Sequence, residues 1–361
     1  MTTTLTPPTG LDLHSYRVRV EERLEAFLTG KARAAQSRAL PALAVEELRV
    51  FLAAGGKRIR PLLCACGWHA AGGEHEPPGL VSTGAALEMF HAFALIHDDV
   101  MDRSATRRGQ PTVHRCLAAE FARTRPLAEA EQLGTSAAIL IGDLALTWSD
   151  ELLHTAGLSP DRLAAAVSLI DEMRTEVMYG QYLDLTGGAR LETSTDLPLT
   201  VIRYKTAKYT IERPLQIGAA LAGADQRLLD DLSAFAIPLG EAFQLRDDLL
   251  GIFGDPGETG KSRLDDLREG KYTVLVALAL AAADKQQAAD LRATLGNQAI
   301  TEAAAGRARE IMTATGAAAG VERMIEERYC QALDALAAAL LPASADHALR
   351  TLAHAVVWRR S

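Results

Sequence analysis

Segments with the pattern of an amphipathic helix follow one another along almost the whole chain, and this constrains the fold more than any other feature. Over residues 12–34, apolar residues recur at helical spacing and fall on one stripe: Leu13, Tyr16, Val20, Leu24 and Phe27. Further helices are predicted at 42–53, 80–102, 117–123, 128–156, 160–185, 199–222, 226–251, 271–295, 299–315 and 318–341. Gly- and Pro-rich breaks separate them, and no strand pattern alternates with them. The sequence therefore predicts an all-α fold, built as a single large helical bundle.

The composition of the 361-residue chain narrows the range of functions. Its 38 Lys and Arg against 46 Asp and Glu give a formal net charge of −8, which argues against a general nucleic-acid-binding surface. Four cysteines in so long a chain are not a disulfide framework. We expect two of them, Cys64 and Cys66, to be thiols in the core.

The first residues are polar and contain Pro, without the apolar segment that is typical of a signal peptide. We interpret residues 1–11 as a flexible tail and residues 12–361 as one domain. No apolar run is expected to reach the length of a membrane span. The predicted location is the cytoplasm.

A long apolar run, Ala85 to Ile96, ends in three acidic residues. Asp98 and Asp102 are four residues apart, so on a helix they share one face, and Asp99 lies beside them. Carboxylates this close repel one another unless a cation holds them. Such hard oxygen ligands suit Mg²⁺, which shares its coordination shell with substrate phosphates. The alternative is a solvated helix end.

A second acidic pair, Asp247 and Asp248, follows the apolar helix pattern from Leu232 to Phe243. One such pair is weak evidence for a metal site. Two pairs, each ending a helix that is expected to be buried, favour facing helices that hold divalent metal between them.

Basic residues stand near both acidic clusters. They occur in four segments: Gly55–Gly56–Lys57–Arg58–Ile59–Arg60–Pro61, Arg107–Arg108, Tyr204–Lys205–Thr206, and the stretch with Lys261 and Lys271. Arg and Lys are the usual holders of phosphate oxygens, although ordinary surface charge is the alternative. A nucleotide-binding P-loop is excluded at Gly254–Gly260, because five residues separate the glycines where the motif needs four. The sequence therefore predicts two anionic groups, one reached through metal and one held by cations.

From about Gly55 to Lys271, these motifs and their order resemble the trans-isoprenyl diphosphate synthases, or polyprenyl synthetases. That family includes farnesyl and geranylgeranyl diphosphate synthases. Asp98, Asp99 and Asp102 match its first aspartate-rich motif. Asp247 and Asp248 match the second, but Gly251 stands where the third acid is expected.

The resemblance implies the isoprenoid synthase type of bundle around a central cavity, a homodimer, and three Mg²⁺ ions in each active site. It implies two substrates, an allylic diphosphate and isopentenyl diphosphate, and no nucleic acid. The positions matching isopentenyl diphosphate contacts are Gly56, Lys57, Arg60, His91 and Arg108. Those matching allylic diphosphate contacts are Arg107, Lys205, Lys261, Lys271, Gln181 and Asp184. Catalytic positions are matched by Lys205, Thr206, Gln244 and Lys261. Phe243 matches the lining of the reaction centre, and Arg359–Arg360 a basic tail over the site.

The implied reaction suits these residue types. Cations neutralise the leaving diphosphate, so the allylic carbon–oxygen bond ionises and the isopentenyl double bond attacks the carbocation. Phe90, Phe93 and Ala94, which lie eight, five and four residues before Asp98, resemble the positions that form the cavity floor. One helical turn of about 5.4 Å matches roughly one isoprene unit. This combination favours geranylgeranyl diphosphate as product, with farnesyl diphosphate next.

Two other functions are compatible with the same fold. A class I terpene cyclase would need an Asn/Asp–Ser–Glu metal triad, but the one Asn in the sequence, Asn297, is far from both clusters, and Gly251 and Ile252 stand where Ser is required. A non-catalytic partner subunit should have lost acids of the first cluster or basic residues among Lys57, Arg58 and Arg60. All are present.

Overall fold

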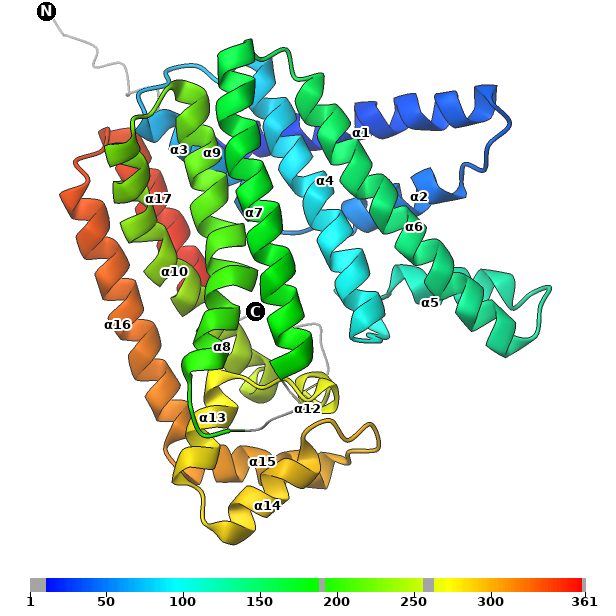
Figure 1. The fold of residues 1–361 in the computed structure, drawn as a ribbon, viewed down its shortest axis with the longest axis vertical. Helices are drawn as coiled ribbons and strands as arrows, with labels where there is room; N and C mark the ends of the chain where they lie inside the picture. The colour runs from blue at the N-terminus through cyan, green and yellow to red at the C-terminus, as the bar shows by residue number, and fades with distance from the viewer. Residues whose placement is uncertain (1–10, 188–191, 256–262, 359–361) are drawn as a thin grey trace, which may run out of the picture.

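The computed structural model describes residues 11–187, 192–255 and 263–358, and these form a nearly all-helical molecule (Figure 1). The first half contains α1 (Leu13–Ser37), α2 (Leu43–Ala53), α3 (Ile59–Ala70), α4 (Pro78–Met101), α5 (Val113–Phe121), α6 (Leu127–His154) and α7 (Pro160–Gly187). The second half contains α8 (Asp196–Val201), the π-helix η1 (Ile202–Glu212), α9 (Arg213–Ala222), α10 (Gln226–Phe253), α12 (Asp265–Glu269), α13 (Val274–Ala282), α14 (Lys285–Thr294), α15 (Glu302–Ala314), α16 (Ala317–Ala338) and α17 (Ala343–Val357). The predicted all-α fold is confirmed. A short antiparallel hairpin, β1 (Thr106–Arg107) and β2 (Gln110–Pro111), follows α4.

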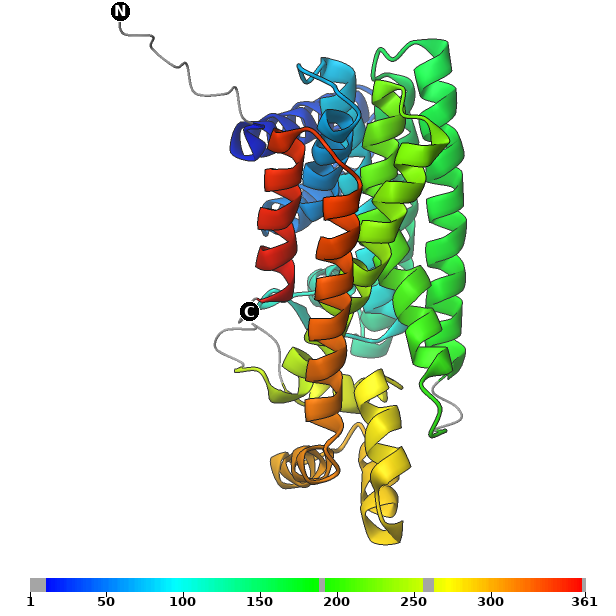
Figure 2. The same ribbon diagram turned by 90° about the vertical axis from the view of Figure 1, so that its left-hand side faces the viewer.

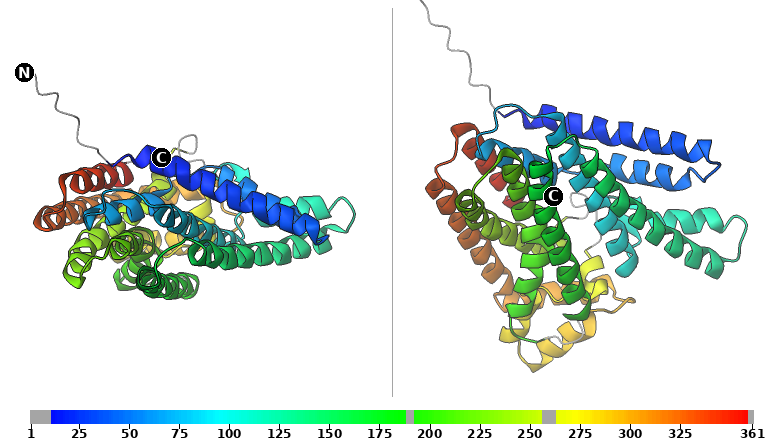
Figure 3. Two further views of the ribbon diagram at one scale, coloured as in Figure 1. Left: turned by 90° about the horizontal axis from the view of Figure 1, so that it is seen from above. Right: turned by 45° about the horizontal axis from the view of Figure 1, so that its top comes forward.

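Several of the long helices run roughly along the long axis of the molecule, which is vertical in Figure 1. In Figure 1, α4, α7, α9 and α16 follow this axis, and α14 and α15 lie across its lower end. The quarter turn in Figure 2 places α17 on one side of the array and α7 on the other. Seen from above, α1 runs obliquely across α3 and α4 (Figure 3), with which it is in contact. Helices from both halves of the sequence thus surround the middle of the bundle.

Two clusters of buried apolar side chains form the core, and α3 and α9 contribute to both. On α3, Leu63 and Cys66 belong to one cluster, and Leu62 and Cys64 to the other. The two cysteines are fully buried, which confirms their prediction as core thiols. Because α3 is covered on all sides, it carries no polar stripe.

Three helices were not predicted from the sequence: α3, α17 and the five-residue α12, which is too short to show an apolar period. α3 has no polar face to mark a helical period, and it starts after Arg58, a residue in the left-handed region (φ 49°) and not a common capping residue. In α17 three of the six buried side chains are alanines, which make a faint apolar stripe.

Two further segments differ from the predicted helices in their internal divisions. The segment predicted as one helix over 271–295 is two, because Ala283 is extended and Asp284 starts α14 with a capping box. The segment predicted over 199–222 contains the π-helix η1 between α8 and α9. A π-helix is rare and often occurs at a functional site.

Helix α4 is long and apolar enough to cross a membrane by length and composition, so the prediction that no run reaches that length was wrong. In the structure, 83% of its most apolar window is buried inside the protein. The apolar side chains of α4 are therefore part of the protein core. The helix ends at Met101, within the first acidic cluster.

Candidate active site

A cavity of about 790 Å³ opens among α3, α4, α7, η1 and α10. The predicted site residues that line it are Gly56, Lys57, Arg60, His91, Phe93, Ala94, Asp98, Arg108, Gln181, Asp184, Lys205, Thr206, Phe243, Gln244, Asp247, Asp248 and Lys271. The predicted residues Lys261, Arg359 and Arg360 lie outside the described part of the chain. The fold therefore collects residues from seven separate segments around one space.

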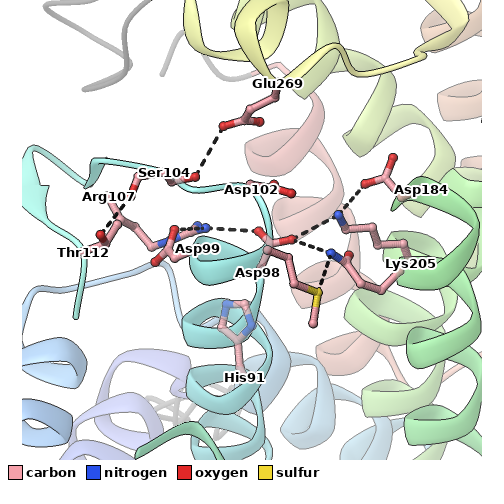
Figure 4. A network of polar contacts seen from close by, with 12 residues as sticks. His91, Asp98, Asp99, Asp102, Ser104, Arg107, Thr112, Asp184, Lys205 and Glu269 are labelled. Atoms are coloured by element: carbon pink, nitrogen blue, oxygen red, sulfur yellow. Dashed lines mark hydrogen bonds and ion pairs between the residues drawn. The ribbon is translucent and has the colours of Figure 1, made fainter. Parts of the chain in front are cut away.

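Asp98 is the centre of the polar network at the end of α4 (Figure 4). Its Oδ1 accepts hydrogen bonds from Lys205 Nζ at 3.2 Å and Gln181 Nε2 at 3.1 Å. Its Oδ2 lies 3.2 Å from Arg107 Nη2. Burial alone would raise the pKa of Asp98, but the charges of Lys205 and Arg107 lower it to about 2. The carboxylate is thus held in its charged form.

The other two acids of this cluster have different surroundings. Asp99 is buried, and both of its carboxylate oxygens accept from Arg107 Nε, at 2.8 and 2.9 Å. Asp102 has a pKa raised to about 6 by burial and by the charge of Asp98. All three stand at the C-terminal end of α4, where the helix dipole disfavours negative charge. Added positive charge is therefore stabilising here.

The second acidic cluster stands near the end of α10, on the other side of the cavity. Burial raises the pKa of Asp248 to about 8, against the effect of the hydrogen bond from Gln244 Nε2 at 2.9 Å. Gln244 Oε1 in turn accepts from Thr206 Oγ1 at 2.8 Å. The predicted catalytic residues Thr206 and Gln244 therefore form one chain of hydrogen bonds that ends on the acidic cluster.

Two lysines lie between the acidic groups. Lys205 Nζ donates to Asp184 Oδ2 at 2.6 Å as well as to Asp98. Burial would lower the pKa of Lys205, but these two carboxylates raise it. Lys271 Nζ lies 2.8 Å from Glu269 Oε2 and 3.8 Å from Asp102 Oδ2. Both lysines line the cavity and remain charged.

A basic corner forms where the loop before α3 meets α4. Arg60 Nη2 donates to Thr210 Oγ1 at 2.6 Å, and the guanidinium lies 4.2 Å from the ring centroid of Tyr209. The Tyr209 hydroxyl and His91 Nδ1 are 2.9 Å apart. Burial and the charge of Arg60 lower the pKa of His91 well below its ordinary value. A neutral His91 can therefore serve an anion as a hydrogen-bond donor.

Gly56 allows the loop to approach Arg108. Its φ is +143°, and a Cβ atom there would lie 2.9 Å from Arg108 Nη2. Arg108 Nη1 also donates to the carbonyl of Gly55. A larger residue at position 56 would push this arginine from the basic corner.

Two residues of this corner, Glu88 and Tyr209, were not predicted to be functional, and Arg58 was predicted only as one of the basic residues that hold phosphate. Arg58 Nη1 donates to Glu88 Oε2 at 2.9 Å, and both side chains are buried. Arg58 also donates to the carbonyl of Leu52, so it ties the loop carrying Lys57 to α2 and α4. Tyr209 holds Arg60 and His91. For Glu88 the available signal was its place one helical turn before His91 on the same helix.

The predicted chain-length residues lie in two layers. Phe93 and Ala94 line the cavity. Phe90 lies behind Phe93, with ring centroids 5.2 Å apart, and is 1% exposed. The ring of His97 contacts Phe93 from the other side, at 4.7 Å between centroids. Phe93 therefore forms the cavity wall, and Phe90 supports it.

The donor set of the site fits a divalent cation. The carboxylates of the two acidic clusters are hard oxygen ligands. Two of them, Asp102 and Asp248, have raised pKa values, and a bound cation would lower these pKa values again. Among the described residues, no three His, Cys, Asp or Glu side chains converge on one point. Mg²⁺ does not require such a cluster, because one or two carboxylates together with waters and substrate phosphates can hold it.

Comparisons with known proteins agree with this geometry. The family model described as polyprenyl synthetase matches residues 42–312. A geranylgeranyl diphosphate synthase of Saccharolobus solfataricus is 34% identical over 265 residues, covering 72% of this chain and 73% of the relative. A (2E,6E)-farnesyl diphosphate synthase of Mycobacterium bovis is 32% identical over 309 residues, covering 85% and 80%.

Among solved structures, the geranylgeranyl pyrophosphate synthase of Corynebacterium glutamicum, complexed with isoprenyl diphosphate and magnesium, is similar over nearly the full chain. Its TM-score is 0.91 and its sequence identity is 40%, with 96% of this chain and 99% of that chain covered. The chain therefore belongs to the polyprenyl synthetase family, has the all-α isoprenoid synthase fold and transfers prenyl groups as a short-chain prenyl diphosphate synthase.

Proposed function

We propose that the enzyme joins an allylic diphosphate to isopentenyl diphosphate head to tail, with geranylgeranyl diphosphate as its main product. The observation that carries this proposal is one cavity with two anion-binding regions and an apolar wall. Asp98, Lys205 and Lys271 stand at one region, and Arg60 and His91 at the other. Two diphosphates can therefore be held at once with their hydrocarbon ends in one space.

Each residue has a defined task in this proposal. Mg²⁺, held by Asp98, Asp102, Asp247 and Asp248, supplies positive charge that stabilises the leaving diphosphate when it is bound. Lys205, Lys271 and Arg107 add positive charge to the same diphosphate. Asp99 orients Arg107, and its predicted contact to a metal stays a prediction.

The second substrate is assigned to the basic corner. Lys57, Arg60, His91 and Arg108 hold isopentenyl diphosphate, with Tyr209 positioning Arg60 and His91. The allylic carbon–oxygen bond breaks, the isopentenyl double bond forms the new carbon–carbon bond, and the released diphosphate takes the proton. Phe93 and its apolar neighbours exclude water from the carbocation. The number of metal ions, the homodimer and the cytoplasmic location stay predictions.

The test is a product assay with the purified chain, Mg²⁺, isopentenyl diphosphate and each of three primers, dimethylallyl, geranyl and farnesyl diphosphate. Geranylgeranyl diphosphate is expected to accumulate from all three, and EDTA is expected to stop turnover. A hydrocarbon formed without isopentenyl diphosphate would instead indicate a terpene cyclase. Absence of any Mg²⁺-dependent turnover would indicate a non-catalytic subunit.

Phe93→Ala is expected to lengthen the product. The substitution removes the ring that lines the cavity and opens space toward Phe90, one turn of α4 further in. A turn of about 5.4 Å is close to one isoprene unit, so the products should be longer by about one unit. Chromatography of the dephosphorylated prenyl alcohols measures the change.

The matched control is Phe27→Ala. Phe27 also packs against an aromatic ring, that of Trp148 at 6.1 Å, but it is not part of the cavity wall. Its variant should keep the product distribution of the wild type. An unchanged distribution for Phe93→Ala would show that this ring does not limit the chain.

A further inference from the structure

Behind the apolar wall of the cavity lies a charged side chain, Arg174 of α7. Its guanidinium carbon lies 5.2 Å from the ring centroid of Phe90, the ring that supports Phe93. The side chain of Arg174 is 17% exposed, and its neighbours on α7, Met173 and Val177, belong to the apolar core. A charged group among apolar side chains costs free energy unless it is paired. The place of Arg174 therefore needs a physical reason.

The polar partners of Arg174 come from α6. Its Nη2 donates to Ser149 Oγ at 2.8 Å, and its Nη1 lies 2.6 Å from Asp150 Oδ1. Ser149 is 1% exposed, whereas the side chain of Asp150 is 40% exposed. The guanidinium is thus in contact with α6 and with the ring of Phe90 on α4, and two polar contacts hold it in place.

The position of Arg174 along α7 places it at the depth of Phe90. At the diphosphate end of the cavity, Gln181 Nε2 of α7 donates to Asp98 Oδ1 of α4 at 3.1 Å. Phe90 lies eight residues before Asp98, and Arg174 lies seven residues before Gln181, which is about 12 Å and about 10.5 Å along the two helices. Val177, which lines the cavity, lies between these levels. Phe90 and Arg174 therefore meet beyond the far end of the space that starts at Asp98.

We propose that Arg174 is a specificity-determining residue, which together with Phe90 forms a second end wall of the cavity behind Phe93. This inference rests on the proposed function, in which the prenyl chain grows from the acidic clusters toward Phe93. A hydrocarbon tail gains free energy against apolar side chains. Beside Arg174 it would instead displace the polar surroundings of a charged group, which costs free energy. The charge therefore limits chain growth even where the ring of Phe93 is removed.

The competing explanation is that Arg174 only fills space behind Phe90. In that case a side chain of similar length should serve equally well, because packing depends on volume and not on charge. Arg174→Met keeps an apolar chain and loses the charge, whereas Arg174→Lys keeps the charge. A second neutral variant, Arg174→Gln, also keeps a hydrogen-bond donor for Ser149. Comparison of these variants separates charge from volume.

The neutral variants are expected to fold, because the partners on α6 do not depend on Arg174. Ser149 Oγ also donates to the carbonyl of Leu146 at 2.7 Å. The carboxylate of Asp150 is partly exposed, so water can replace the guanidinium. A loss of folded protein would in any case lower the yield without shifting the chain length. The length distribution of the products therefore reports on the end wall itself.

The experiment is a product assay in the background of Phe93→Ala, which opens the first wall. With Mg²⁺, isopentenyl diphosphate and farnesyl diphosphate as primer, Phe93→Ala alone should give products about one isoprene unit longer than those of the wild type. Addition of Arg174→Met or Arg174→Gln should lengthen them by about one further unit, since a further helical turn of about 5.4 Å becomes accessible. Addition of Arg174→Lys should leave the distribution of Phe93→Ala unchanged. Chromatography of the dephosphorylated prenyl alcohols measures these shifts.

The matched control is Arg162→Met in the same background. Arg162 is also an arginine of α7 that lies over an aromatic ring, that of Trp68 at 5.4 Å, but it is not part of the cavity wall. It stands twelve residues before Arg174. This variant should keep the product distribution of Phe93→Ala.

The outcomes separate this inference from the proposed function. If neither neutral variant of Arg174 lengthens the products of Phe93→Ala, Arg174 does not limit the chain. If Arg174→Lys lengthens them as much as Arg174→Met, the charge is not the cause, and the inference is overturned. If the wild type forms no prenyl diphosphate from primer and isopentenyl diphosphate, the proposed function fails, and the inference fails with it.

Discussion

Asp98→Asn is expected to lower kcat by about 10³-fold, because Asp98 is the anion on which the cationic side of the site is assembled. Its carboxylate accepts from Lys205 and Gln181 and pairs with Arg107. A neutral amide of the same shape cannot balance the two cations. It is also a weaker ligand for a divalent cation than a carboxylate.

The loss is expected in turnover, with the fold retained. Lys205 keeps its contact to Asp184, and Arg107 keeps both contacts to Asp99. The substitution also relieves the repulsion between Asp98 and Asp102, which contributes to the raised pKa of Asp102. The midpoint of thermal unfolding should therefore change little.

Steady-state kinetics at saturating substrates and increasing Mg²⁺ measure the effect. Asp171→Asn is the control, because Asp171 lies on an exposed part of α7 and should keep wild-type turnover. If turnover of Asp98→Asn stays within about tenfold of the wild type, the assignment of Asp98 to the reaction centre is wrong.

The acidic clusters could be predicted because their signal is local. Asp98 and Asp102 are four positions apart, and any helix with this spacing places both on one face. The apolar segment before them marked α4 as a buried helix. The spacing of the acids and the apolar segment before them both lie within one short stretch of the chain, so the sequence alone was sufficient to predict them.

The supporting contacts could not be predicted because they join segments that are distant in the sequence. Tyr209 reaches Arg60 and His91 across 149 and 118 positions. The buried pair of Arg58 and Glu88 is visible only when α3 lies beside α4. Helix α3 itself escaped prediction, since a helix that is covered on all sides has no polar face to reveal its period.

Gly218→Ala is expected to destabilise the protein strongly, because α3 and α9 are in close contact at this position. A Cβ atom at Gly218 would lie 1.8 Å from the carbonyl oxygen of Cys64 on α3. The contact is equally close in the other direction. A Cβ atom at Gly67 on α3 would lie only 1.9 Å from the carbonyl oxygen of Leu215 on α9. The obstacles are backbone atoms of a buried helix, so they cannot move aside as a flexible side chain can.

Relief of the clash requires α3 and α9 to separate, which loosens both core clusters because each helix contributes to both. The overpacking cost is about 3 kcal/mol, and it exceeds the gain of about 1 kcal/mol that Ala brings to a helix interior. The shift of α3 also moves Arg60 from Thr210 and Tyr209. Loss of stability and weaker binding of isopentenyl diphosphate should therefore appear together.

The control variant, Gly30→Ala, is expected to raise the stability of the protein and not to lower it. Gly30 lies inside α1, and a Cβ atom there meets nothing within 4 Å, so Gly30→Ala should stabilise the protein by up to about 1 kcal/mol. Urea unfolding followed by circular dichroism measures both variants. If Gly218→Ala is as stable as the wild type, the helices do not approach as closely as the structure shows. If both variants gain stability, helix propensity and not backbone contact governs the crossing of α3 and α9.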